Sequence, residues 1–170
     1  MHVRPSDEEP TRRLIGHVIR GELDELEQEI QQMGDDAYRE SLALCVLAAG
    51  YIVVDVAERW PADADVREIA RHASASSETV ELGEDDAYTF LSRAALGGET
   101  LDQVFESVKD IAGVPLWTTS ALLLGFRPRD KHWWEYLDTI WNALDAAEDT
   151  DLSILPALML RSKRLRTAAK

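Results

Sequence analysis

Histidines near carboxylates are the first residues to consider for chemistry, and two of them lie one helical turn from a glutamate. Glu68 and His72 are four positions apart, and His132 and Glu135 are three apart. Each pair would share one face of a helix. Zinc needs three or four ligands, and a di-iron bundle needs Glu-x-x-His in that order, which neither pair has. We therefore predict no metal site and no cofactor, and interpret both pairs as exposed polar neighbours.

Covalent catalysis has no visible support in this chain. Cys45 is the only cysteine and lies inside the apolar run 42–54, which predicts a small core residue and fits a reducing cytoplasm. Nucleophile elbows, phosphate-binding loops and glycine-rich dinucleotide turns are missing. Carboxylate pairs are abundant, but none falls in an apolar context that would raise its pKa. No catalytic residue is predicted, and the sequence favours a protein that is not an enzyme.

One segment has the spacing of a DNA-binding helix pair. Ala57-Glu58-Arg59 is followed, after six residues, by a stretch from Val66 to Val80 that contains Ile69, Ala70 and Ala73 at packing positions and Ser76 as a cap. This segment resembles the helix-turn-helix of the TetR family of repressors. The resemblance implies a scaffold helix, a turn and a recognition helix within 57–82, and a DNA-binding transcriptional regulator as an alternative function.

The same segment departs from the TetR pattern where DNA would be contacted. Ser74 stands where the turn usually has glycine, and Glu81 where an aromatic residue is expected. The implied recognition helix has acids at 78, 81 and 84–86 and no lysine or arginine. Because a recognition helix must approach phosphates, these charges oppose binding to a duplex. Nucleic acid is therefore not the partner that we favour.

Tryptophan is concentrated near residue 133. Three of the five tryptophans lie within 133–141. Helical spacing puts Trp133, Leu137, Ile140, Trp141 and Leu144 on one face and turns Trp134 away from it. Two adjacent tryptophans on a helix cannot both enter one core, so Trp134 must meet another element, another chain or a ligand, and Trp117 could join it. A second contact within the fold, a protein interface and a Trp-lined pocket for a small molecule all remain open.

A second set of apolar residues follows the spacing of a coiled-coil seam. The gaps from Ile19 through Leu23, Leu26 and Ile30 to Met33 are 4, 3, 4 and 3. This pattern predicts one helix from Thr11 to Met33 that ends at Gly34. The seam spans only about two heptads, so contact with another chain and pairing with a helix of the same chain are equally good interpretations. Ile19, Leu23, Leu26 and Ile30 join Trp117, Trp133, Trp134 and Trp141 as interface or ligand candidates.

The elements that would position these residues are all helical. The predicted fold class is all-α: one bundle of about seven or eight helices around a central apolar helix at about 36–59. A strand is the rival only at 50–54, where β-branched residues cluster. Further helices are expected from this pattern at 66–73, 85–96, 101–112, 116–124, 131–147 and 152–165. Residues 1–10 are expected to be a disordered arm, 11–166 one helical domain, and 167–170 a flexible basic end.

The charge of the chain restricts its partners. Among 170 residues there are 32 Asp and Glu against 18 Lys and Arg, a net charge of −14, although 152–170 is basic. No apolar run reaches the roughly 20 residues of a membrane span, and the first residues carry no apolar stretch of a secretory signal. The sequence thus predicts a non-catalytic, cytoplasmic, bacterial protein that works by protein–protein contact, with a basic partner or with itself as a homodimer.

Overall fold

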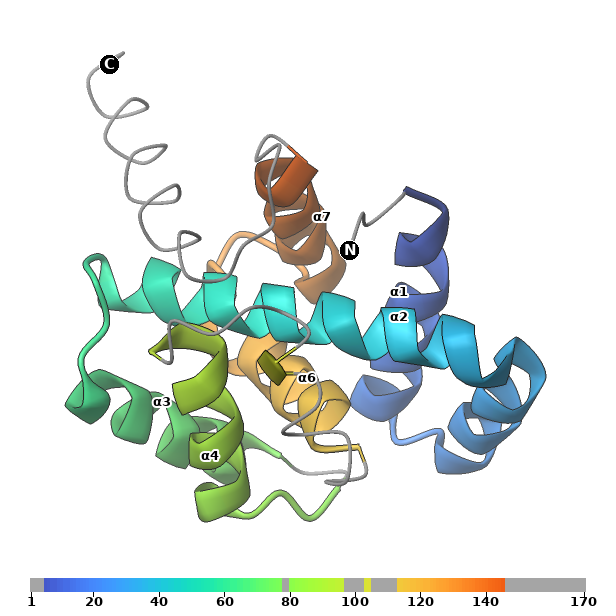
Figure 1. The fold of residues 1–170 in the computed structure, drawn as a ribbon, viewed down its shortest axis with the longest axis horizontal. Helices are drawn as coiled ribbons and strands as arrows, with labels where there is room; N and C mark the ends of the chain where they lie inside the picture. Colours follow the sequence, from blue (N-terminus) through green and yellow to red (C-terminus); the bar gives the residue numbers. More distant parts are fainter. Residues whose placement is uncertain (1–4, 78–79, 97–102, 105–112, 146–170) are drawn as a thin grey trace.

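The computed structural model describes residues 5–77, 80–96, 103–104 and 113–145. All regular structure in these residues is α-helical, which confirms the predicted all-α class (Figure 1). The helices are α1 (Pro5–Arg20), α2 (Leu23–Ala57), α3 (Asp63–Ser76), α4 (Glu84–Ala95), α6 (Val114–Phe126) and α7 (Trp133–Asp145). The helices expected at 101–112 and 152–165, and the basic end at 167–170, lie outside the described residues apart from 103–104.

Helix α1 begins earlier than the sequence indicated. Residues 5–10, expected to belong to a disordered arm, form its first turns. Proline is tolerated at the first position of a helix, where its missing N–H has no partner to lose. Glu8 and Glu9 lie in the first turns of α1, near the positive end of the helix dipole. Pro5 and these acids therefore suit a helix start, whereas Pro10 lies inside the helix.

The prediction of a single helix from Thr11 to Met33 is wrong, because the chain turns at Gly21. Gly21 has a φ of 71°. Its N–H donates to the carbonyl of Val18 (3.1 Å), and the N–H of Glu22 donates to that of His17 (2.9 Å). This is the Schellman pattern of a helix C-terminus, which satisfies two carbonyls and needs a left-handed residue. The apolar seam is thereby divided between α1 and α2, which pack against each other.

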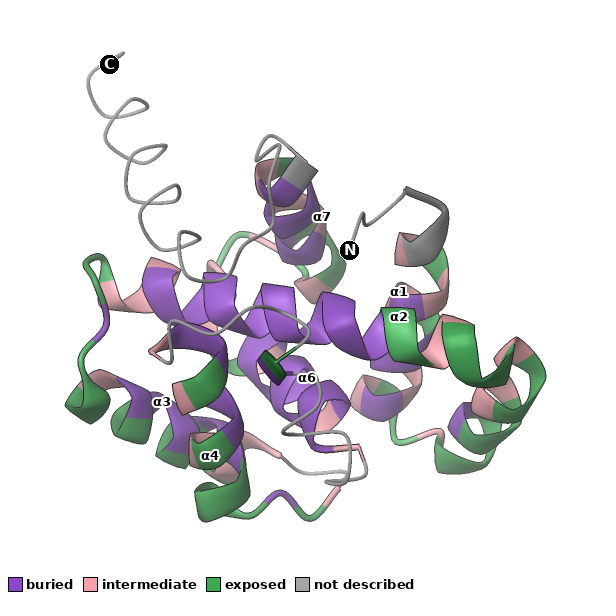
Figure 2. Cartoon of the chain, viewed as in Figure 1, coloured by how far each residue is buried: buried purple, intermediate pink, exposed green. Residues whose placement is uncertain are grey.

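Gly34 does interrupt the chain as predicted, although α2 resumes directly after it. Its backbone angles, φ 78° and ψ 166°, are not helical, and they bend α2 sharply. The first part, Leu23–Met33, forms an arm that carries much of the exposed surface at one end of the molecule (Figure 2). Beyond the bend, every residue from Ser41 to Val54 is buried, in a helix and not in a strand.

Helix α2 ends at Ala57, two residues before the predicted end, with Glu58 in the left-handed conformation. Among the described helices, α2 alone is long and apolar enough to cross a membrane by length and composition. Yet 78% of its most apolar stretch is buried inside the protein, as in a core helix of a globular protein.

The other described helices contact α2 directly. Helices α1, α4, α6 and α7 all contact α2, and α3 packs mainly against α4 and α6. The hydroxyl of Thr119, in the buried middle of α6, donates to the carbonyl of Cys45 (3.0 Å). This bond joins α6 directly to α2.

Candidate functional site

The first turn of α7 is closed by its own side chains. The backbone N–H of His132 donates to the Glu135 carboxylate (2.7 Å), and the N–H of Tyr136 donates to the His132 carbonyl (3.1 Å). A glutamate at the third helical position commonly satisfies a free N–H in this way. Glu135 is therefore engaged in capping its own helix.

Three aromatic rings lie together at this helix start, and we call them the aromatic edge: His132, Trp133 and Trp134. The His132 imidazole stacks on the Trp134 indole, with centroids 4.3 Å apart and planes 7° from parallel. Trp133 meets Trp134 edge-on at 5.7 Å. Trp134 remains 41% exposed, and it is among the few large apolar side chains exposed in the described structure. The stack orders an indole that solvent still reaches.

The opposite face of α7 enters the core, largely as the helical spacing predicted. Leu137, Ile140, Trp141 and Leu144 are buried. Trp133 differs from the prediction, because it is only partly buried and lies at the margin of that face. The indole N–H of Trp141 has no hydrogen-bond partner among the described residues.

Sequence reasoning missed a polar contact on this inner face. The Tyr136 hydroxyl donates to the Asp55 carboxylate (2.9 Å) and joins α7 to α2. Burial and the neighbouring carboxylate both raise the pKa of Tyr136 above its usual value, so the phenol stays protonated and can donate. The two residues are 81 positions apart, and no pattern in the sequence predicts that they pair.

An ion pair ties α7 to α1 as well. Arg12 on α1 pairs with Asp138 on α7, one turn beyond Trp134. The aromatic edge therefore projects from a helix that is held by α2 on its inner side and by α1 at its flank. An exposed aromatic group on a fixed support loses little conformational entropy on binding.

The four seam candidates are distributed unequally between core and surface. Leu26 is buried, Ile19 and Ile30 are partly buried against the core, and Leu23 is 45% exposed. An ion pair between Arg13 and Glu29 (2.8 Å) links α1 to the arm of α2 beside them. Most of the seam is thus used within the chain, with Ile19 on α1 and the other three residues on α2.

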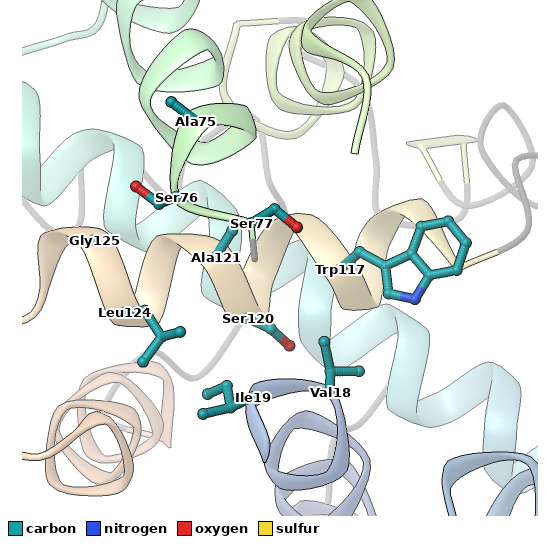
Figure 3. A pocket seen from close by; sticks show the side chains of 10 residues that line it. All are labelled: Val18, Ile19, Ala75, Ser76, Ser77, Trp117, Ser120, Ala121, Leu124 and Gly125. Atoms are coloured by element: carbon teal, nitrogen blue, oxygen red, sulfur yellow. The ribbon is translucent and has the colours of Figure 1, made fainter. Parts of the chain in front are cut away.

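Ile19 and Trp117, two of the predicted residues, both line a cavity between α1, α3 and α6 (Figure 3). Its volume is about 410 Å³, which is within the usual range for small-molecule sites. The remaining lining residues are Val18, Ala75, Ser76, Ser77, Ser120, Ala121, Leu124 and Gly125. None of Trp133, Trp134 and Trp141 lines it, so the structure does not bring Trp117 to Trp134 in one pocket.

Glu68 and His72 border a smaller cavity of about 290 Å³, between the ends of α2 and α6 and the outer side of α3. The His72 imidazole lies against the Phe126 ring, with centroids 4.9 Å apart. In the described part of the chain, no three His, Cys, Asp or Glu side chains form a group able to hold a metal ion.

The TetR resemblance at 57–82 implies a recognition helix, and the described residues of this segment do not form one. Helix α3 continues through the expected turn to Ser76, residues 80–83 are not helical, and α4 starts only at Glu84. Ser74, where the family has glycine, lets the helix continue, and its hydroxyl donates to the Leu82 carbonyl (2.7 Å). This bond holds the following segment against α3 in a non-helical course.

The prediction that Cys45 is a core residue is confirmed. Cys45 is fully buried, and burial raises the pKa of its thiol to about 12. Because the thiolate is the reactive form, this cysteine is chemically inert at neutral pH in the folded protein.

Comparison with known proteins adds no relative: no family model, no curated protein and no solved structure matches this chain. The functional assignment therefore depends on the geometry described above.

Proposed function

We propose that this protein is a non-catalytic, cytoplasmic binding protein, built around α2 as its central helix, that acts by contact with a positively charged protein. The observation that carries the proposal is the aromatic edge, where Trp134 is ordered by His132 and yet 41% exposed. Tryptophan supplies a disproportionate share of binding energy at protein interfaces when it is desolvated by a partner. Trp134 has the position and the rigidity of such an anchor.

Charge selects the kind of partner. The chain carries a net charge of −14, and the region from Leu23 to Glu40 contributes strongly to it. Its exposed acids are Asp24, Glu25, Glu27, Asp35, Asp36 and Glu40, against Arg39 as its exposed base. A field of this sign draws in a basic protein and repels a second copy of the same chain. A basic partner is therefore favoured over self-association.

Differential capture tests this function. Immobilised wild-type protein is compared with Trp134→Ala and with the matched control Trp60→Ala, since Trp60 is 51% exposed in the loop after α2. We expect wild type and Trp60→Ala to retain a partner protein of basic isoelectric point, and Trp134→Ala to lose it. Added salt should release this partner. Equal retention by all three proteins, or retention only of acidic proteins insensitive to salt, would contradict the proposal.

A further inference from the structure

We propose that the cavity between α1, α3 and α6 binds a small uncharged molecule, mainly apolar, whose polar end donates a hydrogen bond. This ligand site is separate from the aromatic edge, because none of its lining residues belongs to α7. Figure 3 shows Trp117 at one end of the cavity, Leu124 and Gly125 at the other, and Val18 and Ile19 of α1 facing them.

The apolar part of the proposed ligand follows from the walls. Val18, Ile19 and Leu124 supply aliphatic surface, and Trp117 supplies an aromatic plane. None of the described residues that line the cavity has a charged side chain. An ionic ligand would therefore find no counter-ion among them, which disfavours carboxylates, phosphates and ammonium ions.

Three hydroxyl groups line the cavity, those of Ser76, Ser77 and Ser120. Ser76, Ser77 and Ser120 each donate their hydroxyl hydrogen to a backbone carbonyl, those of His72 (2.8 Å), Val80 (2.7 Å) and Leu116 (2.8 Å). A hydroxyl that has donated its only hydrogen offers lone pairs to any further partner. The cavity is therefore lined by hydroxyl acceptors, which suit a ligand with an O–H or an amide N–H.

Trp117 is held in place by a local feature of the backbone. Gly113 has a φ of +80°, and a Cβ at that position would lie 2.6 Å from the Trp117 ring. Glycine is therefore required for the indole to lie over the start of α6.

Octanol is a suitable probe because it combines an aliphatic chain with one hydroxyl. Amide NMR spectra of the full-length labelled protein are recorded during titration with octanol, octyl methyl ether and sodium octanoate at neutral pH. We expect saturable octanol shifts centred on the amides of Ser120, Gly125 and Ile19. The ether, which cannot donate, and the charged octanoate should each bind about tenfold more weakly.

Two tryptophan substitutions on one helix provide a matched pair of variants. Ala75 is exposed and lines the cavity, whereas Ala64 is exposed on α3 but does not line it. Ala75→Trp should fill the space and weaken octanol binding about tenfold or more, while Ala64→Trp should leave it unchanged. Both substitutions are at solvent-exposed positions, so both variants should remain folded, which the NMR spectra themselves report.

Three results would overturn the proposal. Octanol shifts that fail to saturate, or that spread over the surface, would show that no site exists. Equal binding to Ala75→Trp and Ala64→Trp would place the site elsewhere, including the case in which another part of the chain or a second copy fills the cavity. Octanoate or the ether binding as tightly as octanol would exclude the ligand class.

Discussion

The hydrogen bond between Tyr136 and Asp55 gives the first residue-scale prediction. The phenol is buried, and its hydroxyl donates to a carboxylate. Tyr136→Phe leaves that carboxylate short of one donor, so we expect unfolding to require about 1–3 kcal/mol less free energy. Urea unfolding measures this.

The surface offers a matched control for that substitution. Tyr88 donates to Asp63 in the same chemical arrangement but in an exposed position. Tyr88→Phe should change the free energy of unfolding by about 0.5 kcal/mol or less. Equal losses in the two variants would show that burial does not distinguish these contacts.

Glu22 gives the residue-scale prediction for pH. Its hydrogen bonds with Arg20 and then His17 lower the pKa of the carboxyl from 4.5 to about 2. A carboxyl with a lowered pKa stabilises the fold above its unfolded pKa and stops doing so as pH falls to its folded pKa. The stability difference between wild type and Glu22→Gln should therefore shrink as pH falls from 4.5 to about 2. A constant difference across that interval, measured by urea midpoints, would refute this role.

At the scale of elements, the bend of α2 depends on one glycine. Gly34 has a φ of 78°, and no atom lies within 4 Å of a Cβ placed there, so only the backbone resists a side chain. Because φ 78° with ψ 166° is a combination essentially restricted to glycine, Gly34→Ala should cost about 1–3 kcal/mol of stability. Gly16→Ala, in the regular part of α1 where only the flexible end of Arg20 must move, should be neutral or stabilising. Urea midpoints of the two variants measure this difference. Equal changes in stability for Gly34→Ala and Gly16→Ala would show that the positive φ of Gly34 is not the cause of the loss.

Local signals in the sequence were enough to predict much of this architecture. Apolar spacing and the break at Gly34 predicted the part of α2 beyond the bend, and the turning away of Trp134 followed from helical geometry alone. The break at Gly21 was missed because the apolar spacing runs through it without interruption; only the left-handed angle of Gly21 reveals the turn. The TetR-like segment departs from the expected pattern because α3 continues to Ser76 and the Ser74 hydroxyl then contacts the Leu82 carbonyl, a contact that the spacing of the motif does not predict.

The candidate sites were less predictable than the helices. Ile19 and Trp117 were singled out for unrelated reasons, and they share a cavity only because the turn at Gly21 places α1 beside α6. The three serines of that cavity carry no motif. Their importance depends on which carbonyls they contact, and this is a property of the packed helices.

At the scale of the whole molecule, net charge governs association. With −14 on each chain, two copies repel, and we expect a monomer of 19.1 kDa by light scattering at two protein concentrations. The mass should stay unchanged between the concentrations at moderate salt. A mass near twice that value, reduced by Trp134→Ala, would make the aromatic edge a self-contact and remove the case for a basic partner.

The central claim is that Trp134 serves contact outside the chain and contributes little to the fold. Urea unfolding of Trp134→Ala, beside the buried Trp141→Ala, tests it most directly. The account predicts a loss of about 1 kcal/mol or less for Trp134→Ala and about 3–5 kcal/mol for Trp141→Ala. A loss for Trp134→Ala as large as that for Trp141→Ala would show that Trp134 is a packing residue, and would contradict the proposed function.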